Sequence, residues 1–264
     1  MPAQADKAAT FAALHRGHPF VIPNPWDVGS ARVLEALGFK ALATTSSGFA
    51  FTLGRPDGGA TLEELLEHIA ALDQATALPL SVDLENGHGP DSAAVATTIS
   101  RAAAAGAVGG SIEDWDPQAG IYPLEQAVER VAAASAAARE LEFPFTLTAR
   151  AENHLRGNPD LDDTIARLRA YEQVGADVLY APGLETAEQI RAVCAASSKP
   201  VNVLARPGLR VNEVFAAGAQ RISLGGALAW TAVEAMAQAA ERIRDEGDLG
   251  ALASPKRIRA WLER

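Results

Sequence analysis

The chain passes from a helix into a strand at Leu37-Gly38-Phe39-Lys40-Ala41-Leu42-Ala43-Thr44. A helical pattern ends at Leu37, a glycine follows, and a short apolar run of strand length comes next. Glycine closes a helix in the left-handed conformation that other residues resist. This stretch therefore predicts a helix that turns directly into a strand.

The same junction recurs at 105–108, 174–177 and 217–220. Helix, glycine and strand in repetition are typical of βα units and a parallel sheet. The pattern predicts strands near 20–23, 40–45, 79–84, 107–112, 145–150, 177–180, 200–204 and 221–224. It predicts helices near 28–37, 61–76, 91–105, 124–140, 160–174, 186–196 and 210–217, and a final helix or pair of helices over 227–262.

Eight strands that alternate with helices favour a (βα)8 barrel of the TIM type, a fold of about 250 residues. An open doubly wound sheet would need a glycine-rich phosphate-binding turn after the first strand, and Asn24-Pro25-Trp26-Asp27 is no such turn. No linker divides the chain. We therefore expect one α/β barrel domain over 1–264, with 227–264 as a C-terminal helical segment.

Composition excludes several classes of protein. The net charge of −10 gives no reason to expect a nucleic-acid partner. No run approaches the ~20 apolar residues of a membrane-spanning helix, and the polar N-terminus lacks a signal peptide. The single cysteine, Cys194, suits a reducing compartment, so we expect a cytoplasmic protein and a packed thiol.

Polar residues follow the predicted strands where each one ends. Active sites of the barrel fold lie at these carboxyl ends. The residues concerned are Asn24, Asp27, Thr45, Ser46, Ser47, Asp83, Glu85, Glu113, Asp114, Arg150, Glu152 and Asn202.

Asp83, Glu85 and Glu113 are candidate metal ligands. Asp83 and Glu85 are two residues apart near one strand end, and Glu113 ends the next strand. Carboxylates brought together would repel one another unless a cation neutralised them, and oxygen ligands favour Mg²⁺ or Mn²⁺ over zinc. The alternative is that such acids cap helices or make turns, and Glu85-Asn86-Gly87 has the composition of a turn.

Arg150 ends a strand and suits an anion, because its planar fork binds carboxylate or phosphate through two bonds. A structural salt bridge to Glu113 or Glu152 is the alternative. Thr45-Ser46-Ser47-Gly48 offers hydroxyl and backbone N–H donors for a carboxylate or oxyanion, or forms only a turn.

The sequence lacks the residues that two classes of enzyme need for catalysis. A Schiff-base aldolase needs a lysine at the active face, and Lys40 and Lys199 open their strands while Lys7 and Lys256 lie near the termini. A serine hydrolase needs a Gly-x-Ser-x-Gly elbow, which is absent from the sequence. Only His88 and His154 are expected on the active face.

Taken together, these motifs resemble the isocitrate lyase/phosphoenolpyruvate mutase superfamily. The similarity covers most of the chain and runs through 24–31, 45–49, 54–58, 82–89, 112–114 and 148–150. The resemblance implies Mg²⁺ at Asp83, Glu85 and Glu113, with Asp57 near the metal and its waters. It implies that Ser47, Gly48, Phe49 and Arg150 hold the substrate carboxylate and that Asn202 faces the ligand.

The resemblance further implies a metal-stabilised enolate, a site closed by a mobile loop, and a homo-oligomer in which the last helix packs onto a neighbouring subunit. The family's usual assembly is a tetramer, although a dimer is also open.

Departures from the family pattern narrow the reaction. The lyases carry Lys-Lys-Cys-Gly-His on the gating loop, where this chain has Trp115–Pro123 and no thiol. The loop Lys and Asn of the mutases are missing too, and Ala181-Pro182-Gly183 stands where mutases place His and Ser. Glu85 replaces the commoner Asp. Isocitrate or methylisocitrate lyase activity is therefore not expected.

The leading hypothesis is an Mg²⁺-dependent enzyme acting on a small 2-oxo acid or phosphonate such as oxaloacetate or phosphonopyruvate. C–C or P–C cleavage, decarboxylation and mutase-type transfer all remain open. Decarboxylation demands least, because solvent or a loop group such as Tyr122 could protonate the enolate. The alternatives are phosphoenolpyruvate phosphonomutase proper, a ligand-binding barrel without catalysis, and an unrelated metal-dependent aldolase.

Overall fold

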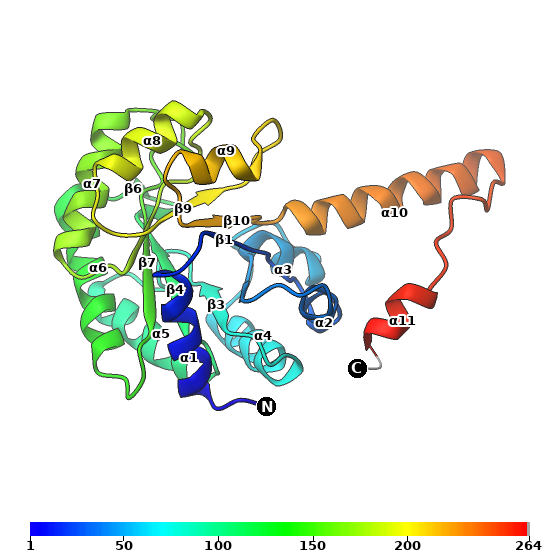
Figure 1. Cartoon of the computed structure of the whole chain (residues 1–264), viewed down its shortest axis with the longest axis horizontal. Helices are drawn as coiled ribbons and strands as arrows, with labels where there is room; N and C mark the ends of the chain where they lie inside the picture. Colours follow the sequence, from blue (N-terminus) through cyan, green and yellow to red (C-terminus); the bar gives the residue numbers. More distant parts are fainter. Residues whose placement is uncertain (263–264) are drawn as a thin grey trace.

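Eight parallel strands form the expected barrel in the computed structural model, which describes residues 1–262 (Figure 1). They are hydrogen-bonded in the order β1-β10-β9-β8-β7-β4-β3-β2, and one bond from Ala43 N to Pro23 O, 3.0 Å long, brings β2 against the end of β1. The strands are β1 Phe20–Ile22, β2 Leu42–Ala43, β3 Leu80–Asp83, β4 Gly109–Glu113, β7 Thr146–Arg150, β8 Val178–Tyr180, β9 Val201–Leu204 and β10 Arg221–Ser223. The predicted barrel is confirmed.

Helices alternate with these strands as the sequence predicted. They are α2 Val28–Ala36, α4 Leu62–Ala75, α5 Ser92–Ala104, α6 Leu124–Arg139, α7 Leu161–Gln173, α8 Ala187–Ala195 and α9 Val211–Ala216. Gly38, Gly106, Gly175 and Gly218, the glycines of the four quoted junctions, have φ angles of 89°, 116°, 102° and 107°. These angles lie in the region that L side chains resist, so the junctions are as predicted.

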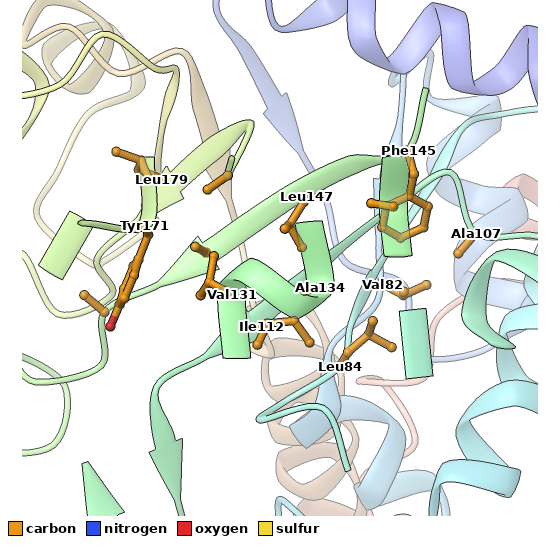
Figure 2. Packing of buried hydrophobic residues seen from close by; sticks show 14 of the residues in the cluster. Val82, Leu84, Ala107, Ile112, Val131, Ala134, Phe145, Leu147, Tyr171 and Leu179 are labelled. Carbon is orange, nitrogen blue, oxygen red and sulfur yellow. The ribbon is translucent and has the colours of Figure 1, made fainter. Parts of the chain in front are cut away.

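The apolar core lies between the strands and the surrounding helices (Figure 2). Val82 and Ile112 from the strands contact the same cluster as Val131 and Ala134 from α6. Small alanines on α5 and α6 let these two helices pack closely against each other. This packing fixes the strand ends that carry the polar residues.

Four elements were not expected. Helix α1, Gln4–Leu14, covers the N-terminal end of the barrel with Ala8 and Phe11 fully buried. A Cβ on Gly109 would lie 2.8 Å from the Phe11 ring, so glycine there makes room for α1. The stretch expected as a Ser/Gly turn begins helix α3, Ser46–Thr52. The expected gating loop holds a short antiparallel hairpin of β5, Trp115–Asp116, and β6, Gly120–Ile121.

The C-terminal segment forms two helices, α10 Ala227–Glu246 and α11 Lys256–Leu262, as predicted. Helix α10, orange in Figure 1, extends away from the barrel, and Ala229 is its one buried residue. None of the described helices combines the length and apolar character needed to cross a membrane.

Candidate active site

An inner cavity of about 210 Å³ opens at the carboxyl ends of the strands. Asn24, Thr45, Asp83, Arg150 and Asn202 are among its lining residues. Asn24 joins three strand ends here, because its Nδ2 donates to Thr44 O at 2.8 Å and its Oδ1 accepts from Leu224 N and Gly225 N at 2.9 Å each. The cavity is therefore at the face where the fold places active sites.

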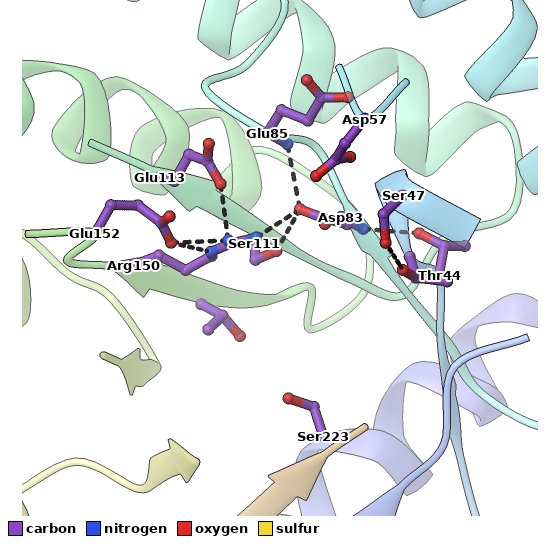
Figure 3. A network of polar contacts seen from close by, with 12 residues as sticks. Thr44, Ser47, Asp57, Asp83, Glu85, Ser111, Glu113, Arg150, Glu152 and Ser223 are labelled. Carbon is purple, nitrogen blue, oxygen red and sulfur yellow. Dashed lines mark hydrogen bonds and ion pairs between the residues drawn. The ribbon is translucent and has the colours of Figure 1, made fainter. Parts of the chain in front are cut away.

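Arg150 is the centre of the polar network in this cavity (Figure 3). Its Nη1 lies 2.9 Å from Asp83 Oδ1, and its Nη2 lies 2.9 Å from Glu113 Oε2 and 2.7 Å from Glu152 Oε1. Burial alone would lower the Arg150 pKa, but Glu113, Glu152 and Asp83 together raise it well above its ordinary value. The salt bridge considered as an alternative is thus present, to both named partners and to Asp83 as well.

An outer cavity of about 220 Å³ adjoins the inner one, sharing Ser46, Asp57, Arg150 and Leu155. Glu85, Glu113, Trp115 and Arg156 also line it. The Arg156 guanidinium lies 3.4 Å from the centre of the Trp115 ring and 3.2 Å from Glu152 Oε2. Asp57 and Arg150 thus face both cavities.

Two of the acids at these cavities, Glu85 and Glu113, hold protons more tightly than usual. Burial raises the pKa of Glu85 to about 7, with Asp83 and Asp57 adding to the rise. Burial also raises the Glu113 pKa against the opposing effect of Arg150. In both cases burial, which disfavours the charged form, is the largest cause of the rise.

The predicted metal ligands are only partly brought together. Among residues 1–262, no group of three His, Cys, Asp or Glu side chains forms a ready metal cage. Glu113 faces Arg150 and Arg156, while Asp83 Oδ1 accepts from Arg150 and, at 3.3 Å each, from Glu85 N and Ser111 Oγ. Charge repulsion instead couples Glu85 to Asp83 and Asp57. Asp57, Asp83 and Glu85 are hard oxygen donors that could hold a divalent cation only with water completing its coordination.

Backbone geometry explains why Glu85 leaves the strand. Its φ angle is 48°, Gly87 follows at 91°, and Gly87 N bonds Leu84 O at 2.7 Å. The predicted turn at Glu85-Asn86-Gly87 is therefore present. Buried Arg130 holds this turn by donating to Asn86 O at 2.5 Å and Gly89 O at 2.8 Å.

Thr45 and Ser47 line the inner cavity, and Thr45 caps α3. Thr45 Oγ1 lies 3.2 Å from Ser47 Oγ and accepts from Gly48 N at 3.4 Å. Gly48 is buried beneath them, where a Cβ would lie 2.7 Å from Thr45 Cγ2, and Phe49 stacks on His68 with ring centres 4.0 Å apart. Gly48 and Phe49 thus support the wall that Thr45 and Ser47 form.

Comparison with known proteins identifies the family of this chain. The model of the family described as phosphoenolpyruvate phosphomutase matches residues 11–244. The chain belongs to this family. The expected resemblance to the phosphoenolpyruvate mutase/isocitrate lyase superfamily is thereby confirmed.

Several relatives of this phosphomutase-family chain have known names or structures. An uncharacterised protein of Mycobacterium tuberculosis is 32% identical over 232 residues, which are 88% of this chain and 87% of the relative. An oxaloacetate decarboxylase of Rhodopseudomonas palustris is 31% identical over 204 residues, 75% of this chain and 70% of the relative.

The fold is shared with solved structures of the same superfamily. A Burkholderia cenocepacia protein named as a candidate lyase/mutase has a TM-score of 0.95 and 50% identity, covering 99% of this chain and 97% of its own. Oxaloacetate acetylhydrolase in complex with oxalate has a TM-score of 0.88 and 27% identity, covering 97% and 93%. The relatives with named activities are thus enzymes.

Of the other residues predicted for the site of this phosphomutase-family chain, Asn202 lines a cavity, whereas Tyr122 and Asp27 make other contacts. Asn202 is buried and lines the inner cavity. Tyr122 lines neither cavity. Its hydroxyl lies 3.0 Å from Asn86 Nδ2 and 3.4 Å from Oδ2 of Asp116, a residue of the hairpin. Asp27, another strand-end acid, caps α2 by accepting from Ser30 N at 2.6 Å.

Other lining residues were missed in the sequence. Ser111, Tyr180, Arg221 and Ser223 all contribute to the inner cavity. Arg221-Ile222-Ser223 alternates polar, apolar and polar residues within one barrel strand, which places both polar side chains on the inner side. This alternation is the sequence feature that could have predicted Arg221 and Ser223 as lining residues.

Proposed function

We propose that this chain is an Mg²⁺- or Mn²⁺-dependent enzyme that acts on a small 2-oxo acid. It breaks a bond to the carbon next to the carbonyl carbon, such as C3–C4 of oxaloacetate, and passes through an enolate. Decarboxylation of oxaloacetate is the reaction we favour. The observation that carries the proposal is Arg150, which faces both cavities and is held there by Asp83, Glu113 and Glu152.

The charge balance supports a cation requirement. Five carboxylates stand against three arginines around the cavities, Arg150, Arg156 and Arg221. The carboxylates are Asp57, Asp83, Glu85, Glu113 and Glu152. A dicarboxylate substrate would be repelled by this excess unless a cation offset it. A divalent cation at Asp57, Asp83 and Glu85 would polarise the 2-oxo carbonyl oxygen and stabilise the enolate.

The chain's own groups orient the acid. The Arg150 guanidinium is positioned to bind an anionic oxygen as charge develops. Thr45 and Ser47 hydroxyls donate to the substrate carboxylate from the opposite wall. Leu155 and Pro182 form an apolar part of the cavity that limits water around the reacting carbons.

Decarboxylation is the cleavage that makes least demand on acid–base side chains, and the inner cavity offers only Asp57, Asp83 and Tyr180 as such groups. No His, Cys or Lys of residues 1–262 lines the inner cavity. Retro-aldol or hydrolytic cleavage needs a base to deprotonate a hydroxyl group or water. In decarboxylation the C–C bond breaks, CO₂ leaves, and the electron pair stays on the enolate, which then takes a proton from solvent. The oxaloacetate decarboxylase relative supports the same choice.

The test is pyruvate release from oxaloacetate, measured with EDTA and with added Mg²⁺ or Mn²⁺ after background correction for decarboxylation by the free metal. We expect turnover that EDTA abolishes and either ion restores. Turnover that persists in EDTA would overturn the metal dependence. No turnover of oxaloacetate would overturn the decarboxylase proposal, and release of phosphate from phosphonopyruvate or isomerisation of phosphoenolpyruvate would replace it.

A ligand-binding barrel would give metal-dependent oxalate binding with no turnover of any 2-oxo acid. Phosphoenolpyruvate phosphonomutase activity has less support, because Ala181-Pro182-Gly183 provides no side chain to donate to a phosphoryl group.

We also propose that the chain forms a homo-oligomer, a dimer or tetramer, through α10. Trp230, Val233, Met236, Ala240 and Ile243 recur at the three- and four-residue spacing of one helix face. Trp230 is 45% exposed and Met236 is 62% exposed. A protruding helix gains most of its stability from packing such a face, and a second copy of the chain would supply the partner.

A further inference from the structure

Arg221 is a buried arginine inside the barrel that has no carboxylate partner. Its exposed fraction is 5%, and it lines the inner cavity. No Asp or Glu of residues 1–262 lies within ion-pair distance of its guanidinium, and burial lowers its pKa to about 10. Burying a charge without an opposite charge beside it costs free energy, so the presence of an arginine at this position needs an explanation.

The contacts of Arg221 hold it in one orientation. Its Nε donates to Asn202 Oδ1 at 2.8 Å, and its Nη2 donates to Thr148 Oγ1 at 3.1 Å. Its Nη1 lies 3.1 Å from His15 Nε2, while His15 Nδ1 lies 2.9 Å from Phe11 O. Since the carbonyl can only accept, His15 carries its proton on Nδ1 and Nε2 accepts from Arg221. His15, which caps the C-terminal end of helix α1, therefore accepts a hydrogen bond from Arg221.

Arg221 in turn decides how the Asn202 amide points. A guanidinium only donates, so Asn202 must present its oxygen to Arg221 and its nitrogen elsewhere. Asn202 Nδ2 donates to Ser223 Oγ at 2.9 Å. One N–H of Nδ2 is then left, and Asn202 lines the inner cavity.

We propose that Arg221 is a positioning residue that fixes the Asn202 amide so that an N–H donates to the bound anion in the inner cavity. The uncompensated charge of Arg221 strengthens this donor by polarising the amide in a water-poor environment. This inference rests on the proposed function for the identity of the cavity as the substrate site. The selected ligand is an anionic carboxylate or enolate oxygen.

The test is a double-mutant cycle on oxalate affinity, measured by calorimetry in the presence of Mg²⁺ with the full chain. The variants are Arg221→Met, Asn202→Ala and the combination of the two. Each single change is expected to weaken oxalate binding about tenfold, the effect of one hydrogen bond to a charged group. The double variant is expected to lose no more than either single variant, because Arg221 acts through Asn202. Fully additive losses would overturn the proposal.

Two further variants distinguish a loss of oxalate binding from a loss of folding. Asn202→Asp gives Arg221 a carboxylate partner, so we expect an unfolding temperature at or above that of the wild type. It also removes the N–H donor, so oxalate affinity is expected to fall by at least tenfold. Arg221→Lys keeps a donor toward Asn202 and is expected to recover part of the loss of Arg221→Met.

The matched control is Thr148→Val, which removes a different hydrogen bond of Arg221 and is expected to change oxalate affinity less than threefold. A loss as large as that of Arg221→Met would favour general disruption and overturn the specific role. Oxalate binding without oxaloacetate turnover would overturn only the proposed reaction. If the wild-type chain binds no oxalate, the cavity is not the anion site and both proposals fall.

Discussion

Arg150 Nη1 contacts Asp83 Oδ1 at 2.9 Å, which joins the carboxyl ends of β7 and β3 across the intervening β4. The side chain of Arg150 is 11% exposed and that of Asp83 is 15% exposed, so water screens this pair only weakly. The pair sets both the position of the guanidinium and the position of one predicted metal ligand. Changes at either residue are therefore expected to affect substrate binding and the site's shape together.

Replacing Arg150 by lysine is expected to lower kcat/KM for oxaloacetate by about 100-fold or more. A single ammonium group cannot reproduce the fork that contacts Asp83, Glu113 and Glu152 while it faces the cavity. Steady-state kinetics with pyruvate detection measure the change. The control is Arg139→Lys, which alters a half-exposed ion pair with Asp177. Equal kinetics in wild type and Arg150→Lys would remove Arg150 from the proposed mechanism.

Arg150→Ala should also destabilise the fold. It leaves Glu113 and Glu152 buried without their main cation, a change that typically costs about 3–5 kcal/mol. Urea unfolding of the wild type and the variant at pH 7 measures the free energy of unfolding. A loss below 1 kcal/mol, the range of exposed ion pairs, would show that the network contributes little to stability.

Glu85→Gln is expected to raise the Mg²⁺ concentration that gives half-maximal activity by about tenfold, because it removes one charge-assisted oxygen donor. Asp57→Asn should act in the same direction with a smaller effect, since Asp57 reaches the site from a different loop. Titration of metal-free enzyme with Mg²⁺ measures both. Glu188→Gln, on the exposed side of α8, is the matched control. An unchanged Mg²⁺ requirement in both variants would remove the proposed cation site.

The barrel could be predicted because each βα unit carries its own local signal. The helix-closing glycines are local features, and all four quoted junctions have the positive φ angle they implied. Polar residues at strand ends are also visible in the local sequence. Arg150, Asp83 and Asn202 could therefore be predicted as candidate site residues, and all three line the inner cavity.

The pairing of these residues could not be predicted, because it depends on contacts between distant elements. Helix α1 looked like a polar N-terminus, since Phe11 becomes a core residue only where Gly109 makes room for it. Tyr122 looked free to act in the loop, but Asn86 and Asp116 hold its hydroxyl. Arg221 opens β10, and the parallel register places it beside Asn202 of β9, a pairing between strands that the sequence alone does not show.

The contribution of His15 to stability is expected to fall on acidification. Glu85 acts in the opposite sense, because its raised pKa lets the folded state take up a proton first. Burial, together with Arg221, lowers the His15 pKa to about 3, whereas the unfolded chain takes up this proton near pH 6.5. Well above pH 6.5 His15 is neutral in both the folded and the unfolded chain, so it does not change the free energy of unfolding. As pH falls from 7 to 5, only the unfolded state gains the proton, so the free energy of unfolding should drop by about 2 kcal/mol from this site.

His15→Gln keeps an acceptor for Arg221 but cannot titrate. Between pH 7 and pH 5 its free energy of unfolding should therefore lose about 2 kcal/mol less than that of the wild type. Urea unfolding at pH 7 and pH 5 measures the difference. The control is His18→Gln, three residues away and exposed, which should keep the wild-type dependence. The same pH dependence in His15→Gln and in the wild type would contradict a neutral, buried His15.

Helix α10 gives the last prediction. Light scattering after gel filtration should find the wild-type chain as a dimer or tetramer. Met236→Glu should shift it toward a smaller species, because a charge on the exposed apolar face opposes burial against a second copy. Gln238→Glu adds the same charge two residues along, on the opposite side of the helix, and should leave the assembly unchanged. A monomeric wild type would leave Trp230 and Met236 exposed in solution and would end the proposal that α10 is a subunit interface.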